Sequence, residues 1–162
     1  MFKEIIAIVG AAIIGIGAFI SSALSEDAVP SAKQFGFFNK DDVQKTLPKK
    51  HNKTMFENRL VDDPSAGVRV VRIYGPVRPH LHKKSDTHLY VLSGRAIVHL
   101  KGDKPREVKA GDTMFWRRDV IHSIPRILEH PFDMMTFDSP RRSPTDVVAT
   151  DGGGNPLTME VN

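Results

Sequence analysis

Short stretches of alternating hydrophobic and polar residues fill the chain from residue 53 to residue 140. Glycine, proline and aspartate separate them, as in Gly102-Asp103-Lys104-Pro105 and Gly111-Asp112. Many short strands at this spacing are typical of an all-β sandwich or barrel rather than a parallel α/β sheet. We therefore predict one all-β domain at 53–140, with strands at 53–61, 68–74, 88–92, 96–100, 106–109, 113–117, 123–128 and 132–137.

An uninterrupted apolar run occupies residues 5–20, after Lys3 and before acidic residues. A membrane-spanning helix needs about 17 to 25 apolar residues and the core of a signal peptide about 7 to 15, so the run fits either. Ala23-Leu24-Ser25 and Ser21-Ser22-Ala23 offer small residues for cleavage. We predict a signal peptide or membrane anchor at 1–25, which would place the domain in the periplasm or outside the cell, attached to the membrane if uncleaved.

The segments on either side of the predicted domain are rich in turn-forming residues. Residues 26–52 are predicted to be a linker with one short helix, which Asn39 caps, Asp41 and Asp42 begin, and Pro48 ends. Residues 141–162 contain two prolines and the run Asp151-Gly152-Gly153-Gly154-Asn155-Pro156. They are expected to form a surface-hugging or loose tail.

Composition excludes several classes of function. Hydrophobic residues make up 40% of the 162 residues and charged residues 26%, which indicates a soluble domain with a sizeable core. The absence of cysteine excludes disulfides, thiolate metal sites and a cysteine nucleophile. The net charge is +4, but the basic residues are scattered and no aromatic series accompanies them, so we predict no nucleic-acid binding. The chain has no phosphate loop, nucleophile elbow or dinucleotide fingerprint.

Histidines supply the candidate chemistry. His80 and His82 stand at i and i+2, so on a strand both imidazoles point to the same face. His122 is the third candidate ligand. Neutral imidazole binds divalent transition metals well, and three imidazoles leave coordination positions open for water or a substrate. The alternative is that His80 and His82 are solvated and that His122 is a hydrogen-bonded strand residue.

Two segments resemble the paired motifs of the cupin family. His80-Leu81-His82, followed by Thr87 and Gly94, resembles the first motif, and residues 111–122, GDTMFWRRDVIH, are similar to the second. The resemblance implies a cupin-type jelly-roll barrel (double-stranded β-helix), here preceded by an N-terminal hydrophobic helix. It also implies one divalent transition metal (Fe, Mn, Zn or Ni) in the barrel mouth, with His122 on a strand opposite His80 and His82, and assembly as a homodimer.

The chain departs from the first motif at Thr87, where the family usually has a metal-binding glutamate. Either three histidines and water complete the site, or a strand bulge makes His88 a fourth ligand. Strand parity places Thr87 inside with Leu89 and turns His88 and Tyr90 outward. Asp86, in a polar turn, is a weaker candidate ligand.

The second motif also departs from the family, because Arg117 and Asp119 replace the usual proline and glycine. Arg117 or Arg118 can hold a substrate carboxylate or phosphate, and an ion pair with Asp119 is the alternative. Tyr90 and Thr87 are further candidates for substrate contacts. Phe115 and Trp116 must face opposite sides of their strand.

Two functions fit these features, and no catalytic residue is predicted for either. The first is an exported mononuclear metalloenzyme that performs oxygenase- or isomerase-type chemistry on a small molecule through a three-histidine site. If the protein is an enzyme, we expect a metal-dependent, dioxygenase-like oxidoreductase, because a site without the glutamate resembles the three-histidine ligand set of thiol dioxygenases; the sequence does not choose among the other reactions of metal cupins. The alternative is a non-catalytic cupin module that binds or senses a small ligand at the membrane.

Overall fold

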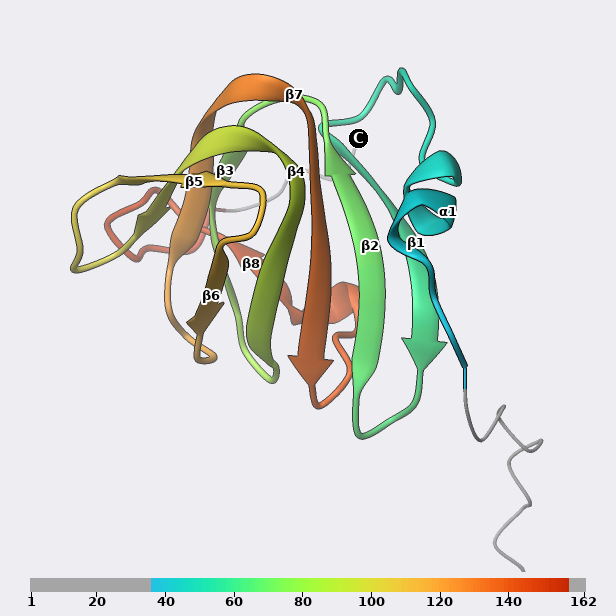
Figure 1. Ribbon diagram of the computed structural model, residues 1–162. Coiled ribbons are helices and arrows are strands. Elements are labelled where there is room, and N and C mark those ends of the chain that lie inside the picture. Colours follow the sequence, from blue (N-terminus) through green and yellow to red (C-terminus); the bar gives the residue numbers. More distant parts are fainter. Residues whose placement is uncertain (1–35, 158–162) are drawn as a thin grey trace, which may run out of the picture. The chain divides into compact units, whose positions relative to one another are not determined.

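A computed structural model describes residues 36–157, and this part of the chain folds into strands with one short α-helix (Figure 1). The predicted signal or anchor segment at 1–25 and the first part of the predicted linker lie outside the described residues. Within the described part, no helix is long and apolar enough to cross a membrane. The elements are α1 (Lys40–Lys45), β1 (Met55–Asp62), β2 (Gly67–Ile73), β3 (Val77–His82), β4 (Asp86–Leu100), β5 (Arg106–Lys109), β6 (Thr113–Trp116), β7 (His122–Ser139), the 3-10 turn η1 (Pro144–Asp146) and β8 (Val147–Ala149).

Two long strands, β4 and β7, run antiparallel through the middle of the sheet, and both bend. The first half of β4 and the second half of β7 lie between β6 and β2, and β1 pairs with β2. Their other halves lie between β5 and β3, and β8 pairs with β3. The sheet therefore curls around its own apolar face, and the prediction of an all-β jelly-roll fold is confirmed.

Gly94 makes the bend in β4 possible. Its φ is +76°, which L-residues rarely adopt, and a Cβ there would lie 2.4 Å from the carbonyl oxygen of Pro131 and 2.5 Å from that of Glu129. The pairing register shifts at the same place, since Ser93 pairs with Asp133 and Arg95 with Glu129. A side chain at this position would push β4 and β7 apart.

The inner face of the curled sheet holds the main core. Thr87 and Leu89 are 1% and 3% exposed, whereas Tyr90 is 44% exposed, so the predicted strand parity is correct. The buried apolar residues of this core come from β2, β3, β4, β6 and β7: Val71, Ile73, Val77, Leu89, Val91, Ala96, Val98, Trp116, Ile124, Phe132 and Met134.

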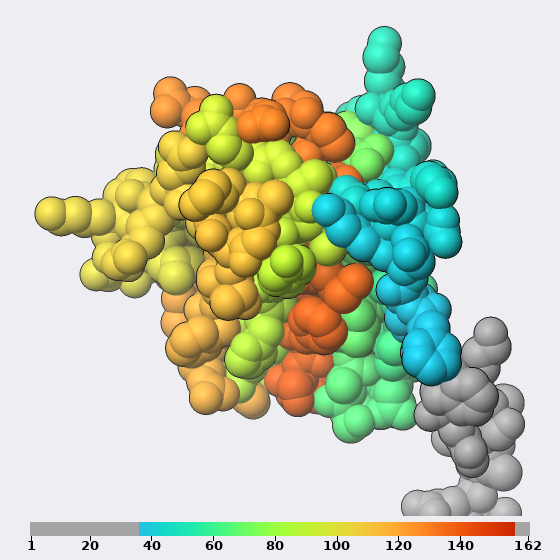
Figure 2. Space-filling view, viewed as in Figure 1, coloured from blue at the N-terminus to red at the C-terminus, as the bar shows by residue number. Residues whose placement is uncertain are grey.

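Helix α1 covers part of the outer face, which is why β2 is buried on both sides (Figures 1 and 2). Val43 and Leu47 pack there on Val70 and Leu92. The predicted short helix is present, and the side chain of its N-cap residue, Asn39, accepts hydrogen bonds from the first-turn amides.

An ion pair lies beneath the helix. The Arg72 guanidinium donates to both carboxylate oxygens of buried Asp133, at 2.7 and 2.8 Å. Gln44 of α1 donates to the same carboxylate at 2.8 Å, and Arg72 donates to the carbonyl oxygen of Leu47 at 3.0 Å. These bonds tie α1 to β2 and β7.

Two strands are longer than predicted, because each continues through a segment that was expected to be a turn. The predicted strands at 88–92 and 96–100 are two halves of β4, and those at 123–128 and 132–137 belong to β7. The region predicted to be a surface-hugging or loose tail also contributes β8, which pairs with β3. This strand was not expected, because its three residues form an element only beside the free edge of β3.

Candidate metal centre

Three histidines meet at the end of β3. His80 and His122 are direct partners in the antiparallel register of β3 and β7, and His82 is buried two residues further along β3. One ring nitrogen from each histidine lies within 4.8 Å of the others. The expectation that His122 comes from a strand opposite His80 and His82 is wrong, because β7 is the neighbouring strand of the same sheet. The cluster itself forms as predicted.

Backbone contacts orient two of the rings. The Nδ1 atom of His80 lies 2.9 Å from the carbonyl oxygen of Arg78, and Nδ1 of His122 lies 2.9 Å from that of Val120. A carbonyl only accepts, so both Nδ1 atoms carry the proton and both Nε2 atoms keep a free lone pair. Metal-binding histidines are commonly oriented by such contacts.

Burial keeps all three imidazoles neutral. It lowers the pKa of His80, and it lowers the pKa of His82 to about 2, with added repulsion from Arg142 and the other two histidines. Burial, with a smaller contribution from charge repulsion by His80, lowers the pKa of His122 to about 3. At neutral pH the cluster therefore has lone pairs and no positive charge of its own, which is the state that binds a metal cation.

An arginine from the C-terminal segment contacts the cluster. Nη1 of Arg142 lies 2.7 Å from Nε2 of His82, and since a guanidinium only donates, His82 is the acceptor. The proton of His82 is then on Nδ1, which is buried without a hydrogen-bond partner. A positively charged group thus already faces one of the three lone pairs. Arg142 was not a sequence candidate, because nothing in the tail's pattern shows that it folds back on β3.

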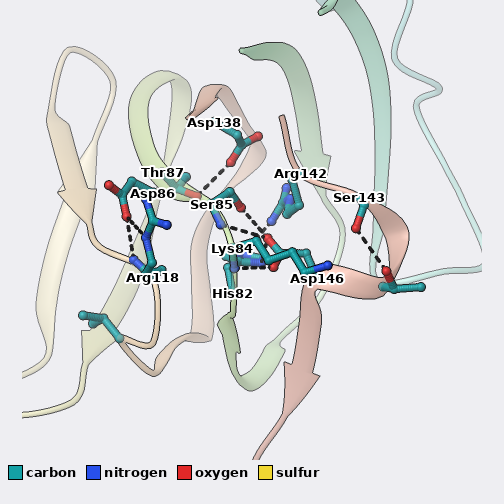
Figure 3. A network of polar contacts seen from close by, with 12 residues as sticks. His82, Lys84, Ser85, Asp86, Thr87, Arg118, Asp138, Arg142, Ser143 and Asp146 are labelled. Atoms are coloured by element: carbon teal, nitrogen blue, oxygen red, sulfur yellow. Dashed lines mark hydrogen bonds and ion pairs between the residues drawn. The ribbon is translucent and has the colours of Figure 1, made fainter. Parts of the chain in front are cut away.

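Buried carboxylates fix this segment and the neighbouring strand (Figure 3). Asp146 of η1 accepts hydrogen bonds from the backbone amide of Lys84, at 2.6 Å, and from the side chain of Ser85. Its Oδ2 is 4.0 Å from Nδ1 of His82. Asp146 therefore holds the C-terminal segment against the turn after β3, with Arg142 beside the histidines.

Thr87 has no carboxylate to offer a metal, but it lies next to the carboxylate of Asp138. Its hydroxyl donates to Oδ1 of Asp138 at 2.8 Å, and Asp138 is 1% exposed. Arg69 pairs with Asp138 and also with Glu57, at 2.8 Å. The carboxylate of Asp138 is therefore occupied, and only the sheet register reveals that it stands opposite Thr87.

Thr87 also lines a narrow cavity of about 50 Å³ below the histidines, together with Trp116 and Thr136. The ring centroid of Trp116 is 4.1 Å from that of His122. The indole Nε1 of Trp116 and the hydroxyl of Thr136 are buried without a hydrogen-bond partner among the described residues. Unpaired buried polar atoms of this kind are uncommon unless water or a ligand pairs with them.

The structure does not bring His88 or Tyr90 to the cluster. Both are exposed on the outer face of β4, and His88 stacks on exposed Phe115 with ring centroids 5.7 Å apart. Phe115 and Trp116 face opposite sides, as predicted. No bulge turns His88 inward, since it pairs in register with both neighbouring strands.

Arg117 and Arg118 also lie apart from the cluster. They bind Asp86, at 2.9 and 3.2 Å, so the ion pair is made with Asp86 instead of Asp119. Hydrogen bonds from Arg118 and Arg117 hold the pKa of Asp86 well below its usual range. Asp119 pairs with Lys83 and has φ +64°, a left-handed conformation that aspartate tolerates better than most residues. The turn before His122 therefore forms without glycine.

Residues 73–136 match the model of the cupin domain family. No curated protein matches the sequence.

Several solved structures share the fold at low sequence identity. KdgF from Halomonas sp. is 22% identical, with a TM-score of 0.53 over 59% of this chain and 88% of that one. The DMSP lyase DddQ from Ruegeria pomeroyi is 20% identical, with a TM-score of 0.53 over 63% of this chain and 54% of that one. A cupin-2 domain protein from Shewanella frigidimarina is 18% identical, with a TM-score of 0.52 over 64% and 94%. At these identities the likeness is one of fold.

Proposed function

Because this chain belongs to the cupin superfamily, we propose that His80, His82 and His122 hold one divalent transition metal ion, of which Fe, Mn, Zn and Ni are the candidates. The observation that carries the proposal is the convergence of three neutral ring nitrogens within 4.8 Å. Histidine nitrogens suit these metals, and the chain has no cysteine to supply a thiolate.

The surroundings of the three histidines fit a cation. The Nδ1 atoms of His80 and His122 are held by carbonyl oxygens, which leaves Nε2 for a ligand. At His82 the Arg142 guanidinium donates to Nε2 and occupies the lone pair that a metal would use. A metal at this lone pair requires Arg142 to move away.

We further propose that the site acts on a small molecule. A bound divalent ion would supply a Lewis acid with open coordination positions, since residues 36–157 bring only three candidate ligands together. The unpaired polar atoms of Trp116 and Thr136 support a ligand or water beneath the cluster. The proposed chemistry is of the oxygenase or isomerase type expected from the sequence; one protein that shares the fold, DddQ, is a DMSP lyase.

Metal titration tests this proposal. Full-length protein, dialysed in turn with Fe²⁺ under anaerobic conditions, Mn²⁺, Zn²⁺ and Ni²⁺, should retain one ion per chain for at least one of these metals. Trp116 is the single tryptophan of the chain and lies beside His122, so Ni²⁺ should also quench its fluorescence. Protein that retains no stoichiometric metal under saturating conditions would refute the proposal.

A non-catalytic binding or sensing module is the alternative, and the residue at position 87 favours it. Thr87 donates to Asp138 and offers no carboxylate to a metal. Oxygen uptake and product formation over small thiols, diols and keto acids separate the two functions. Metal-loaded protein that binds a compound and converts none of them would favour the binding module.

We also propose that the domain works outside the cytoplasm, which rests on the apolar run at 5–20 alone. A reporter fused after Asn162 should be active outside the cytoplasm, and activity only inside would contradict this. The homodimer that the family resemblance implies stays a prediction.

A further inference from the structure

A cavity of about 550 Å³ opens beside the histidines, and its polar lining is mostly positive. It lies between β1, β3 and the C-terminal segment, where His80 and Arg142 connect it to the metal centre. Its charged side chains are one glutamate and four arginines: Glu57, Arg59, Arg69, Arg78 and Arg142. The rest of the lining is largely apolar.

Two of these arginines form ion pairs with carboxylates of the described residues, and two do not. Arg59 pairs with Asp62 at 3.1 Å, and Arg69 pairs with Glu57 and Asp138. Arg78 and Arg142 have no carboxylate within 4.0 Å among residues 36–157. The cavity wall therefore carries positive charge that no described side chain neutralises.

Carboxylates lie in the surroundings of Arg142, but each is already bound elsewhere. Asp138 is bound by Arg69 and Thr87, and Asp146 by the amide of Lys84 and the side chain of Ser85. Arg142 is partly buried, and its one hydrogen bond among the described residues goes to a neutral imidazole. A guanidinium binds a carboxylate more strongly, and often with two parallel hydrogen bonds.

We propose that this cavity binds a small molecule bearing a carboxylate, which Arg142 holds, with Arg78 at the rim and the apolar part of the molecule against the cavity wall. The proposal rests on the small-molecule function proposed above and names its substrate class. A carboxylate bound there stands next to His80, within reach of a metal at the three histidines.

The position of Arg142 also links carboxylate binding to metal binding. Arg142 donates to the lone pair of His82 that a metal needs, so metal and guanidinium compete for Nε2. A carboxylate that draws Arg142 into the cavity frees this lone pair. Carboxylate and metal therefore bind with positive cooperativity, and by thermodynamic reciprocity each raises the affinity for the other, by about tenfold as typical of such couplings.

The experiment measures Co²⁺ affinity of the full-length protein through Trp116 fluorescence, with saturating butyrate or with butyramide at matched ionic strength. Butyrate should tighten Co²⁺ binding about tenfold, and the uncharged amide should not. Arg142→Met should bind Co²⁺ more tightly without butyrate and should no longer respond to it. The matched control is Arg106→Met, which removes an arginine that pairs with Asp103 outside the cavity and should respond to butyrate like the wild type.

The outcomes separate this inference from the proposed function. Co²⁺ binding that butyrate leaves unchanged in the wild-type protein would overturn the carboxylate site while leaving the metal site intact. An equal effect of sulfate would overturn the assignment to carboxylates. Absence of Co²⁺ binding in both the wild type and Arg142→Met, with no retention of Fe²⁺, Mn²⁺, Zn²⁺ or Ni²⁺ on dialysis, would instead overturn the metal site. The wild-type comparison needs no substitution, so it holds even if Arg142→Met fails to fold.

Discussion

His122→Ala is expected to weaken metal binding by about 100-fold or more, which corresponds to about 2.7 kcal/mol. Loss of a partner that only orients a metal ligand typically costs up to about 100-fold, and His122 is proposed as a ligand itself. The substitution leaves two of the three converging ring nitrogens. Equilibrium dialysis with Zn²⁺ or Ni²⁺ measures the effect without depending on Trp116, whose ring lies against His122.

His88→Ala provides the matched control for this experiment. His88 is also a histidine of the first motif, but it lies on the outer face and stacks on Phe115. Its replacement should leave metal affinity unchanged. An equal loss in His88→Ala and His122→Ala would show that the sheet register around His88 differs in the metal-bound protein and that His88 is a ligand.

Gly94→Ala is expected to destabilise the fold by about 3 kcal/mol or more, as the sum of an unfavourable φ and steric overlap. The added Cβ would meet two backbone carbonyl oxygens at 2.4 and 2.5 Å, and backbone cannot yield as a flexible side chain can. Because Gly94 lies where β4 crosses from one half of the sheet to the other, the strain falls on its pairing with β7. Denaturant unfolding of the full-length protein measures the change.

Gly111→Ala separates the two causes. Gly111 also has a left-handed φ, +94°, but nothing lies within 4 Å of a Cβ built there. It should cost about 1 kcal/mol, the penalty for φ alone. A loss at Gly111 as large as that at Gly94 would mean that backbone conformation, rather than the close approach of β7, makes Gly94 necessary.

Much of the candidate site could be predicted from the sequence because its signals are local. His80 and His82 share a face by strand periodicity, and parity alone placed Thr87 inside and His88 outside. The same rule predicted that Phe115 and Trp116 face opposite sides of their strand. Asn39 marked the start of the helix, since an N-cap is a contact between residues two or three positions apart.

The partners of these residues could not be predicted, because they depend on register between distant strands. Asp138 stands opposite Thr87 only because β4 and β7 pair as they do. From the sequence, Asp119 was the alternative partner of Arg117 or Arg118, because it is the nearer acidic residue. The turn before β4 brings Asp86 closer, and the arginines bind there.

The sequence by itself determined the all-β class, the three histidines and the missing carboxylate at position 87. The tertiary structure alone decided that His122 lies on the strand next to His80 instead of on a strand across the barrel. It also decided that the C-terminal segment adds β8 and brings Arg142 to His82. The physical reason is range. Periodicity and capping act over a few residues, whereas the position of Arg142 depends on a free edge of β3 and on the buried carboxylate of Asp146, both of which exist only once the sheet has formed.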